Sequence, residues 1–593
     1  MEMLLRHTTM TELAQLFARH QDRSPAPYLT DPDSVARAKG LAKGNGIWDD
    51  LSEHLDLSRD IPVIKRSAFR NFQRVGDRTL PQTKAAYRRR ELDRAAMALW
   101  LGHPKADVDY LQDLLWAYCD DHTWVMAAHE GRAIDLGSAA LGATFSEILH
   151  VLGHHLEEEV KERVPAEIER RIFRNFWNYK HMDFWETVRM NWNHVCNGEI
   201  IRTALYQIED PNMLAHFTHA AIQHLTYALD GFTDDGGCEE GPGYWAYGFG
   251  HFLYVAHALY LKTDGELNLM RDDRIPRICR YPLAAHISGP LRATFADADH
   301  GYIPARIAMI INEFYEMPEL YELCARHPDG TLKVSGMHEL AFYKGQKGHG
   351  MVDHRDYLLP DLGLVKLRGK PGMEQMTVMA LAENNGVPHN HNDIGSFMVH
   401  RGDRIFLTDP GGPLYTRKTF SSQRYEIVFC NSMGHAVPVI DGTLQELGSQ
   451  YYGTLETENL NGKGQKRAII DMTHAYPEGT VKKLVRTFAL DADANRLTLE
   501  DVYTFACTPK SLEEAFITFE RASVSRNGRS VLIGPEGDQL RLSAVDTPGQ
   551  FRAVRLVEES KEGRTDEVIT RITFVPEKLD LEMDLRFEIS GLR

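Results

Sequence analysis

The sequence predicts a multidomain α+β protein, with a helical N-terminal part and a β-rich C-terminal part. A chain of 593 residues is too long for one ordinary hydrophobic core. Over roughly the first 340 residues, apolar side chains recur at spacings of three and four, the period of an amphipathic helix. From about residue 345, short alternating segments rich in β-branched residues take over. Helices first and strands second indicate separate domains rather than one alternating α/β sheet.

The helical part, residues 1–340, is expected to consist of helices joined by short loops. Antiparallel helix pairs of this kind can close into a ring or an incomplete toroid, and no fixed-period repeat indicates a named solenoid. The clearest helical segments are Thr83–Trp100, Val108–Tyr118, Leu136–Glu158, Met213–Leu229 and Tyr244–Leu261.

The β part is expected to form antiparallel β-sandwich layers. Its boundary with the helical part is placed between Asp329 and His354, where Gly- and Lys-rich segments resemble a linker. A second seam near Thr508–Ser511 separates a central sandwich, residues 345–510, from a smaller C-terminal β domain, residues 511–593. The expected strands include Leu362–Leu367, Thr377–Ala382, Arg404–Thr408, Val481–Leu490, Arg496–Thr504, Gln539–Ser543 and Val568–Phe574.

The formal net charge of −17 argues against a nucleic-acid partner. It also fits poorly with a polyanionic ligand, but net charge describes the far field, and binding depends on the local potential in a cleft. The basic side chains that could form a local patch are Arg88, Arg89, Arg90, Arg417, Lys418 and Arg424.

The sequence as it stands predicts a cytoplasmic protein, or a periplasmic or secreted one whose signal peptide has been removed. No uninterrupted apolar run reaches the length of a membrane span, so no membrane partner is expected. Residues Met1–Ala18 lack the continuous apolar core of a secretory signal. The seven scattered cysteines offer no CxxC pair and are expected to be reduced and mostly buried. The sequence leaves open whether the protein forms a homodimer.

Residues 191–198 (NWNHVCNG) are the first segment that combines polar groups with glycine and aromatic side chains. Three Asn and one His in eight residues are unusual near a helix start, because Asn disfavours helix interiors. They form either a capping and core hydrogen-bond cluster, or an amide and an imidazole that face a cleft and bind a carboxylate.

The second segment, residues 234–247, is a Gly/Pro-rich loop that enters a helix. Tyr244 and Tyr247 lie three residues apart on one helical face, either in the core or near a ligand. Glu239 and Glu240 are a poor match for the carboxylate pair of a glycoside hydrolase, because sequence neighbours seldom face each other.

The third segment, residues 384–397 (NNGVPHNHNDIGSF), is the most informative. His389 and His391 alternate, so on an extended stretch both would point the same way. Asp409 and His435 follow downstream. Two His and one Asp are a plausible Zn²⁺ set, and a buried cluster of hydrogen-bonded histidines is the alternative.

These three segments, in this order, resemble the heparinase II/III-like polysaccharide lyases, which pair an N-terminal (α/α) toroid with C-terminal β-sandwich layers. The resemblance spans roughly residues 80–510. It rests on the pair Asn193-His194, on the Glu-Gly-Pro-x-Tyr-x-x-Tyr element of residues 240–247 and on the His-x-His segment of residues 389–391. Each motif alone is only moderately specific, whereas the ordered set is strong.

The resemblance implies roles for individual residues. Tyr244 would be the Brønsted base and acid, His389 would act beside it, and Asn193 with His194 would bind the uronate carboxylate. Tyr247 would lie nearby in the cleft, and Arg88 and Arg424, which come from the basic patch and not from the resemblance, are the other expected substrate-binding residues. The residues that match the ligands of a structural zinc ion are His391, Asp409 and His435, although Ala436 stands where the family pattern has an Asn.

The predicted activity is that of a carbon–oxygen lyase, which cleaves uronic-acid-containing glycans by β-elimination and leaves unsaturated uronate ends. Glycosaminoglycans (heparan sulfate, hyaluronan, chondroitin sulfate) are the first expected substrates, and alginate or oligoalginate is the second. The alternatives are a glycoside hydrolase, a non-catalytic glycan-binding protein and a zinc hydrolase with an open metal position. No organic cofactor is expected, because neither a P-loop nor a Rossmann fingerprint is present.

Elimination removes the weakly acidic proton beside the uronate carboxylate. Hydrogen bonds from Asn193 and His194 would stabilise the enolate-like state in which charge develops. A tyrosine normally titrates near ~10, so Tyr244 would need cationic or hydrogen-bonding neighbours such as His194 and His389. The sequence leaves open which of the three residues takes the first proton.

Overall fold

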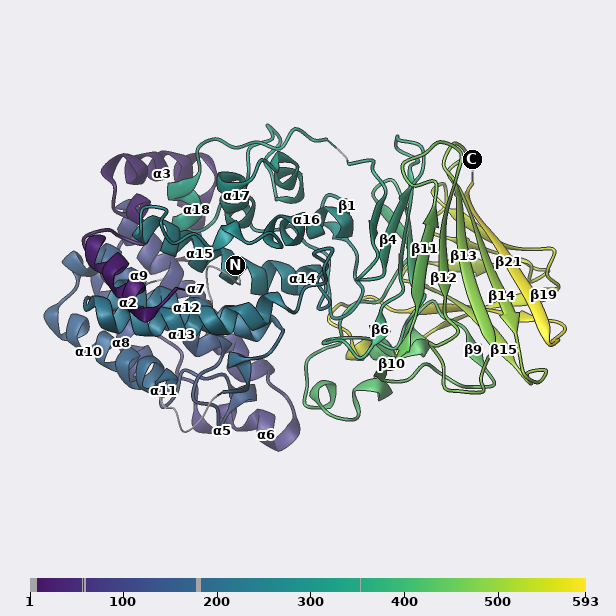
Figure 1. Ribbon diagram of the computed structural model, residues 1–593, viewed down its shortest axis with the longest axis horizontal. Helices are drawn as coiled ribbons and strands as arrows, with labels where there is room; N and C mark the ends of the chain where they lie inside the picture. The colour runs from purple at the N-terminus through teal and green to yellow at the C-terminus, as the bar shows by residue number, and fades with distance from the viewer. Residues whose placement is uncertain (1–7, 56, 58–59, 178–182, 352, 593) are drawn as a thin grey trace. The chain divides into compact units, whose positions relative to one another are not determined.

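The computed structural model describes residues 8–55, 57, 60–177, 183–351 and 353–592. The chain divides into two compact units, and it crosses between them several times. The helical unit comprises Met1–Gly231, Trp245–Ile275 and Ile303–Gly350; the β unit comprises Phe232–Tyr244, Pro276–Tyr302 and Met351–Arg593. Figure 1 shows helices throughout the first unit and sheets in the second.

The helical unit is built from α-helices with short connections, as predicted. Aspartates cap the N-termini of several of them: Asp31, Asp107, Asp135 and Asp210 each accept a hydrogen bond from a backbone N–H of the first turn. The helices are α2 (Met10–Arg19), α3 (Pro32–Gly44), α4 (Ile47–His54), α5 (Arg66–Phe69), α6 (Asn71–Val75), α7 (Thr79–Leu101), α8 (Val108–Asp120), α9 (Leu136–Leu152), α10 (Glu158–Ile168), α11 (Arg174–Phe176), α12 (Asn191–Gln207), α13 (Pro211–Leu229), α15 (Gly250–Lys262), α17 (Ala305–Phe314) and α18 (Met337–Phe342).

Helix α12 forms the core of this unit. Nearly all its side chains from Asn191 to Leu205 are buried, and it packs against α9, α13 and α15. Such all-round burial is typical of a helix enclosed by other helices. A Cβ at Gly198 would lie 3.2 Å from the backbone oxygen of His251, so the absence of a side chain lets α12 and α15 approach closely.

Two of the five predicted helices are interrupted. The segment predicted as Leu136–Glu158 ends α9 at Leu152 and passes through the 3₁₀ turn η3 (Gly153–His155). The segment predicted as Tyr244–Leu261 contains a π-helical stretch, η6 (Trp245–Phe249), before α15. Within the described part of the chain one helical stretch, Leu136–His155, is long and apolar enough to span a membrane, but 56% of that window is buried among its neighbours, as in a core helix.

The β unit contains three main antiparallel sheets. The five-stranded sheet has the order β3 (Tyr357–Leu359), β4 (Leu364–Arg368), β5 (Met376–Leu381), β7 (Phe397–Arg401), β8 (Arg404–Leu407). The eight-stranded sheet has the order β11 (Thr454–Glu458), β12 (Gln465–Asp471), β13 (Lys483–Asp491), β14 (Arg496–Thr504), β21 (Glu582–Gly591), β18 (Leu540–Val545), β17 (Ser530–Ile533), β16 (Ala522–Val524). The four-stranded sheet has the order β19 (Gly549–Arg555), β20 (Thr570–Pro576), β15 (Leu512–Thr518), β9 (Val439–Ile440).

Smaller elements complete this unit. Strands β1 (His286–Ser288) and β2 (Leu291–Arg292) form one two-stranded sheet, and β6 (Asn384–Asn385) pairs with β10 (Gly448–Tyr452) in another. The short helix α14 (Pro242–Tyr244) also belongs here, and α16 (Ile275–Ala285) leads into β1. The seven predicted strands all lie within one to two residues of strands in the structure.

The three main sheets share one hydrophobic core, as expected of sandwich layers. Val378, Phe488 and Phe574 come from the five-, eight- and four-stranded sheets and are all buried in it. Strands β13 and β14 alternate buried and partly exposed positions, so one face of their sheet packs on the core and the other faces solvent.

The five-stranded sheet is covered on both faces, which explains why two stretches from the N-terminal half belong to the β unit. Strands β4, β5 and β7 are buried at every position. Lys366 Nζ donates to the backbone oxygens of Leu283 at 2.6 Å and His286 at 2.8 Å. These bonds join β4 to the Pro276–Tyr302 stretch, which the sequence placed in the helical part.

Strands from both sides of residue 511 share sheets. Strand β14 pairs with β21 over nine residues, and β9 pairs with β15. Residues 345–510 and 511–593, which the sequence separated into two domains, are therefore interleaved in one β unit, because their strands are partners in the same sheets.

Candidate functional site

His389 lies in a loop of the β unit, and its backbone is in the left-handed region, with φ of +61°. For a residue with a Cβ this conformation is strained and is held by its surroundings. Arg424 Nη2 donates to the backbone oxygens of His389 at 3.2 Å and Asn390 at 3.1 Å. Asn390 Nδ2 in turn donates to the backbone oxygen of Asn385 at 2.8 Å. Arg424, predicted to bind substrate, thus anchors the loop that carries His389.

Asp297 is the centre of the site, and the sequence did not predict it. Its Oδ2 accepts from His389 Nδ1 at 2.7 Å and from the Tyr415 hydroxyl at 2.9 Å. Its Oδ1 accepts from Arg424 Nη2 at 2.8 Å and lies 3.1 Å from His391 Nε2. Burial alone would raise the pKa of this carboxyl, but the bonds from both histidines and the charge of Arg424 hold that pKa well below its usual range.

The Asp297 carboxylate orders the protons around it. An ionised carboxylate only accepts hydrogen bonds, so the hydrogen of Tyr415 points to Asp297 and the hydrogen of His389 sits on Nδ1. In a neutral imidazole this leaves the lone pair on Nε2. Glu240 Oε2 lies 3.6 Å from that nitrogen. Both oxygens of Asp297 are occupied, which disfavours a role as the nucleophile or base of a glycoside hydrolase.

Tyr244, at the end of α14, completes the group. Its ring stacks on His389, with the centroids 4.2 Å apart and the planes at 21°. Its hydroxyl shares a short hydrogen bond with that of Tyr415, and because the Tyr415 hydrogen points to Asp297, Tyr244 is the donor. Burial raises the pKa of Tyr244 to about 12, so its hydroxyl keeps its proton at neutral pH. The β unit thus brings together two predicted catalytic residues, Tyr244 and His389.

Tyr415 was also missed from the sequence. Its ring lies under the guanidinium of Arg564, 4.3 Å from the centroid, and Arg564 Nη1 donates to Asp299 at 2.7 Å. Burial and the nearby charge of Asp297 raise the pKa of Tyr415. Tyr415 follows the predicted metal ligand Asp409 by a few residues, but no local pattern distinguishes it from a packing tyrosine.

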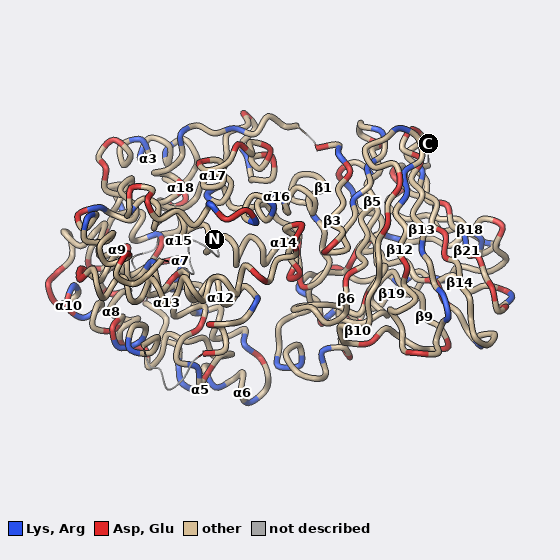
Figure 2. The backbone as a smooth tube through the Cα atoms, viewed as in Figure 1, with Lys and Arg blue, Asp and Glu red and all other residues tan. Residues whose placement is uncertain are grey.

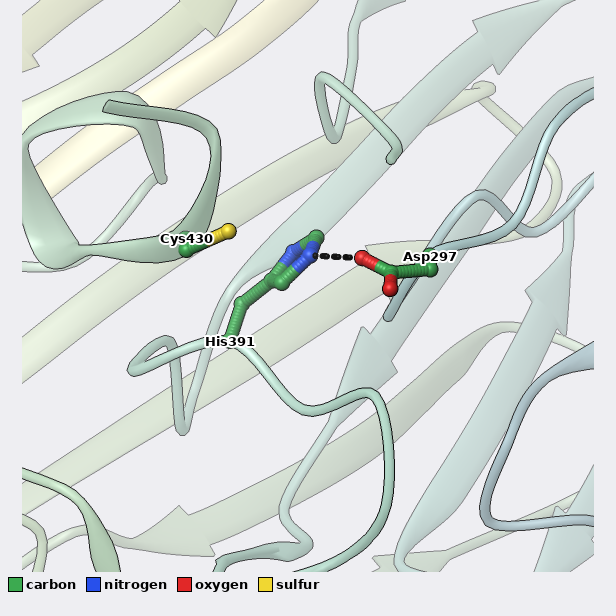
Figure 3. A group of neighbouring side chains, drawn as sticks. All are labelled: Asp297, His391 and Cys430. Atoms are coloured by element: carbon green, nitrogen blue, oxygen red, sulfur yellow. Dashed lines mark hydrogen bonds and ion pairs between the residues drawn. The ribbon is translucent and has the colours of Figure 1, made fainter. Parts of the chain in front are cut away.

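Two groups of side chains in the β unit have the donor types of a metal site. Figure 3 shows the first, in which His391 lies between Asp297 and Cys430. Burial raises the pKa of the Cys430 thiol to about 12, so without a cation the thiol is protonated at neutral pH. Asp297 is already saturated by hydrogen bonds. This group therefore fits a hydrogen-bond network better than a metal.

The second group, His391, Asp393 and His435, fits a zinc ion. One ligand atom from each lies within 4.8 Å of the others, and Asp409 Oδ2 is 2.9 Å from His435 Nδ1. His391 Nδ1 is buried and makes no hydrogen bond with any described residue, as expected of an atom that faces a cation, and Asp393 Oδ2 lies 3.4 Å from His435 Nδ1. Two imidazoles and two carboxylates suit Zn²⁺ and would close its coordination sphere. Asp393 is a fourth candidate ligand beside the three predicted ones. The sequence signal for it is the spacing, because His389, His391 and Asp393 stand at every second position.

The remaining predicted site residues lie in the helical unit, where Asn193 is a structural residue. Its side chain is fully buried, and Nδ2 donates to the backbone oxygens of Glu186 (3.1 Å), Val188 (3.1 Å) and His224 (2.9 Å). Its Oδ1 accepts from Asn197 Nδ2 at 2.9 Å. This amide has no capacity left for a carboxylate ligand, so the capping-and-core alternative describes it.

His194 and Tyr247 differ in exposure. His194 is 2% exposed, and burial lowers its pKa to about 3, so the imidazole is neutral. Tyr247 is 40% exposed, and its ring meets that of His251 edge-on, with the centroids 5.4 Å apart. His251 is fixed in turn by Glu199, whose Oε1 lies 2.5 Å from Nδ1.

Arg88 supports the helical core rather than a ligand. Its side chain is 1% exposed, its guanidinium lies over the Tyr118 ring at 4.0 Å, and Nη1 donates to Asp121 at 2.9 Å. An arginine so enclosed is a structural cation. Arg88 is therefore placed away from solvent, contrary to its predicted role.

Comparison with solved structures gives the fold. A structure of heparinase III matches with a TM-score of 0.60 and 12% identity, over 95% of this chain and 92% of that one. A heparan sulfate lyase from Pedobacter heparinus matches with a TM-score of 0.55 and 12% identity, over 94% and 87%. A chondroitin AC lyase from Streptomyces coelicolor matches with a TM-score of 0.51 and 10% identity, over 95% and 82%. No family model matches the sequence, and no curated protein does. The chain has the fold of the heparinase-like polysaccharide lyases, with a helical toroid followed by antiparallel sheets.

Proposed function

We propose that this protein is a polysaccharide lyase that cleaves uronic-acid-containing glycans by β-elimination. The observation that carries the proposal is the stack of Tyr244 on His389, with both side chains ordered by the buried carboxylate of Asp297. It pairs a phenol that keeps its proton with an imidazole whose free nitrogen can take one. The lyase fold described above adds support.

The geometry suggests how two protons move. His389 Nε2 takes the proton from the carbon beside the uronate carboxylate, and the bond from the next carbon to the glycosidic oxygen breaks. Tyr244 gives its hydroxyl proton to that oxygen, which leaves a double bond in the uronate. The imidazolium of His389 then returns a proton to the Tyr244 phenolate stacked on it, through solvent, and both groups are restored.

Neighbouring groups prepare this pair. Asp297 fixes the tautomer of His389 and stabilises its imidazolium, as a buried carboxylate does for a catalytic histidine. A zinc ion at His391, Asp393, Asp409 and His435 would neutralise the carboxylates and hold the His389–Asp393 segment in place. His194 stays a predicted carboxylate ligand.

The proposed substrates are glycosaminoglycans, ahead of alginate. Heparinase III, heparan sulfate lyase and chondroitin AC lyase are the names of the matched structures given above, and none of these is an alginate lyase. Figure 2 shows Lys and Arg interspersed with Asp and Glu in both units, so basic side chains for an acidic glycan are present despite the net charge of −17.

The test is incubation of the purified protein with heparan sulfate, hyaluronan, chondroitin sulfate and alginate, followed by ultraviolet absorbance of the unsaturated uronate. Tyr244→Phe is the catalytic variant, and Tyr451→Phe, whose hydroxyl donates to the exposed residue Glu446, is the matched control. Absorbance that rises with the parent and with Tyr451→Phe, but not with Tyr244→Phe, is expected. New reducing ends without ultraviolet absorbance of an unsaturated uronate would show that the protein is a hydrolase and not a lyase.

A further inference from the structure

Arg132 is an exposed arginine fixed on two aromatic rings of the helical unit. It lies on the loop between the 3₁₀ turn η2 (Ala127–His129) and α9. Its guanidinium carbon is 4.1 Å from the ring centroid of Phe184 and 5.4 Å from that of Trp192. The two rings contact each other, with centroids 5.1 Å apart. Stacking of this kind holds the planar cation without occupying its N–H donors.

No described residue pairs with this cation. The guanidinium of Arg132 makes neither an ion pair nor a hydrogen bond within the described ranges. Its charge lowers the pKa of Asp183, but burial is the larger effect there and raises that pKa, and the two side chains form no ion pair. In a protein with 84 acidic residues, a fixed and exposed arginine that has no acidic partner among the described residues offers its donors to solvent or to a ligand.

A second stacked arginine gives the contrast. Arg163 lies over Trp116 at 4.0 Å, much as Arg132 lies over Phe184. Arg163 Nη2, however, donates to Asp120 at 2.5 Å. Stacking alone therefore does not distinguish Arg132; the unpaired donors do.

The rings beside Arg132 can bind the apolar face of a sugar. Phe184 is 39% exposed, and Trp192 is half-buried at the start of α12, two residues before His194. Aromatic faces bury C–H-rich surface well, and a guanidinium binds a carboxylate or a sulfate through paired N–H donors. One acidic sugar unit carries both an apolar face and an anionic substituent, so it can contact the rings and the guanidinium together.

We propose that Arg132, Phe184 and Trp192 form a subsite for one acidic sugar of the polysaccharide, with its carboxylate or sulfate on Arg132. The subsite rests on the proposed lyase function and specifies where the chain of the substrate is held. Arg132 is a binding residue and takes no part in proton transfer. Because the cation is already fixed by the two rings, little side-chain entropy is lost when the anion binds.

The experiment measures binding and turnover separately. Binding of heparan sulfate and hyaluronan oligosaccharides is followed by calorimetry in full-length Tyr244→Phe, with Arg132→Gln, Arg132→Lys, Phe184→Ala or Arg163→Gln added. We expect Arg132→Gln to raise the Kd about tenfold, Arg132→Lys less, and Arg163→Gln by less than twofold. A carboxylate contact affects both oligosaccharides, whereas a sulfate contact affects only heparan sulfate.

The second readout is turnover, measured in the protein that keeps Tyr244. There Arg132→Gln is expected to raise KM about tenfold and leave kcat within twofold, with an unchanged Tm. An unchanged Kd in Arg132→Gln, or a parent protein that binds neither oligosaccharide, would overturn the subsite. If Arg132→Gln weakens binding but the parent protein yields no unsaturated product, the subsite is supported and only the proposed lyase function is contradicted.

Discussion

Asp297 Oδ2 lies 2.7 Å from His389 Nδ1, and the same carboxylate reaches His391 Nε2 through its other oxygen at 3.1 Å. One buried anion thus joins the imidazole stacked on Tyr244 to the imidazole of the candidate metal site. The tautomer and the orientation of His389 depend on this carboxylate, because no other anion lies on Nδ1 among the described residues. Four predictions concern this group, and one concerns the helical core.

Asp297→Asn is expected to lower kcat about 10²–10³-fold. The amide no longer offers two anionic acceptors, so His389 loses the partner that keeps its hydrogen on Nδ1 and stabilises its imidazolium. Steady-state kinetics on the responding glycan, with Tm measured in parallel, tests this. The matched control is Asp299→Asn, two residues away, which pairs with Arg564 at a half-exposed position. Equal activity in the two variants would exclude a positioning role for Asp297.

Tyr415→Phe is expected to lower kcat about tenfold and to move the alkaline limb of the pH–rate profile upward. Burial raises the pKa of Tyr244 to about 12, and the Tyr415 hydroxyl opposes this rise, because it can turn its hydrogen toward the Tyr244 phenolate once that group has ionised. Loss of the hydroxyl removes the lowering contribution, so the pKa of Tyr244 rises and its ionisation shifts to higher pH. The measurement is kcat against pH for the parent and the variant. A limb that moves downward, or a change in KM alone, would contradict the proton order derived for the pair.

Removal of a metal ion is expected to destabilise the protein before it abolishes binding of glycan. Four protein ligands would leave no open position for substrate, so a bound ion would stabilise the fold by the amount of its binding free energy. Metal analysis should find about one zinc per chain, and chelation should lower Tm. Asp393→Asn should retain less metal than the parent, whereas Asp403→Asn, at an exposed turn, should retain as much. A chelated protein with unchanged Tm would argue against a structural zinc.

Much of the fold could be predicted because it depends on local periodicity. The alternation in residues 481–504 identified β13 and β14, and the helical spacing of residues 83–100 identified α7. The stretches Phe232–Tyr244 and Pro276–Tyr302 were placed in the wrong unit, because their membership depends on tertiary contacts such as that of Lys366 with the Leu283 backbone. No periodic pattern encodes such contacts.

The site could be predicted only where a motif carries it. His389, His391 and Tyr244 lie in segments with unusual local composition. Asp297 lies 92 positions from His389 and in an ordinary Ala-Asp-Ala-Asp stretch, so only the folded chain brings the two together. Asn193 illustrates the opposite error: three Asn in one segment marked the region, but composition could not tell which amide is saturated by backbone oxygens.

Asn193→Ala is expected to destabilise the helical unit by about 2–4 kcal/mol, because three backbone oxygens lose their donor in a buried place. The variant that remains folded should bind glycan with nearly the parent KM. Thermal unfolding and KM, measured together, separate the two effects. Asn212→Ala, at an exposed position of α13, is the control and should change stability by less than ~0.5 kcal/mol. A raised KM with unchanged Tm would restore Asn193 as a substrate ligand.

Ala296→Gly is expected to leave stability almost unchanged, although the alanine is buried. Ala296 precedes Asp297 and has φ of +60°, a conformation that costs a residue with a Cβ about 1–2 kcal/mol. Glycine removes this strain, but it loses about 0.8 kcal/mol of methyl burial and about 0.5–1 kcal/mol through the entropy of the unfolded chain. These contributions nearly cancel.

Ala298→Gly provides the comparison, because Ala298 is equally buried and its φ is not positive. There only the two losses act, so the variant should be less stable by about 1.5 kcal/mol. Thermal unfolding of both variants gives the difference directly. Equal destabilisation of the two would mean that the backbone at Ala296 stores no strain, and that Asp297 is held by its hydrogen bonds to His389, Tyr415 and Arg424 alone.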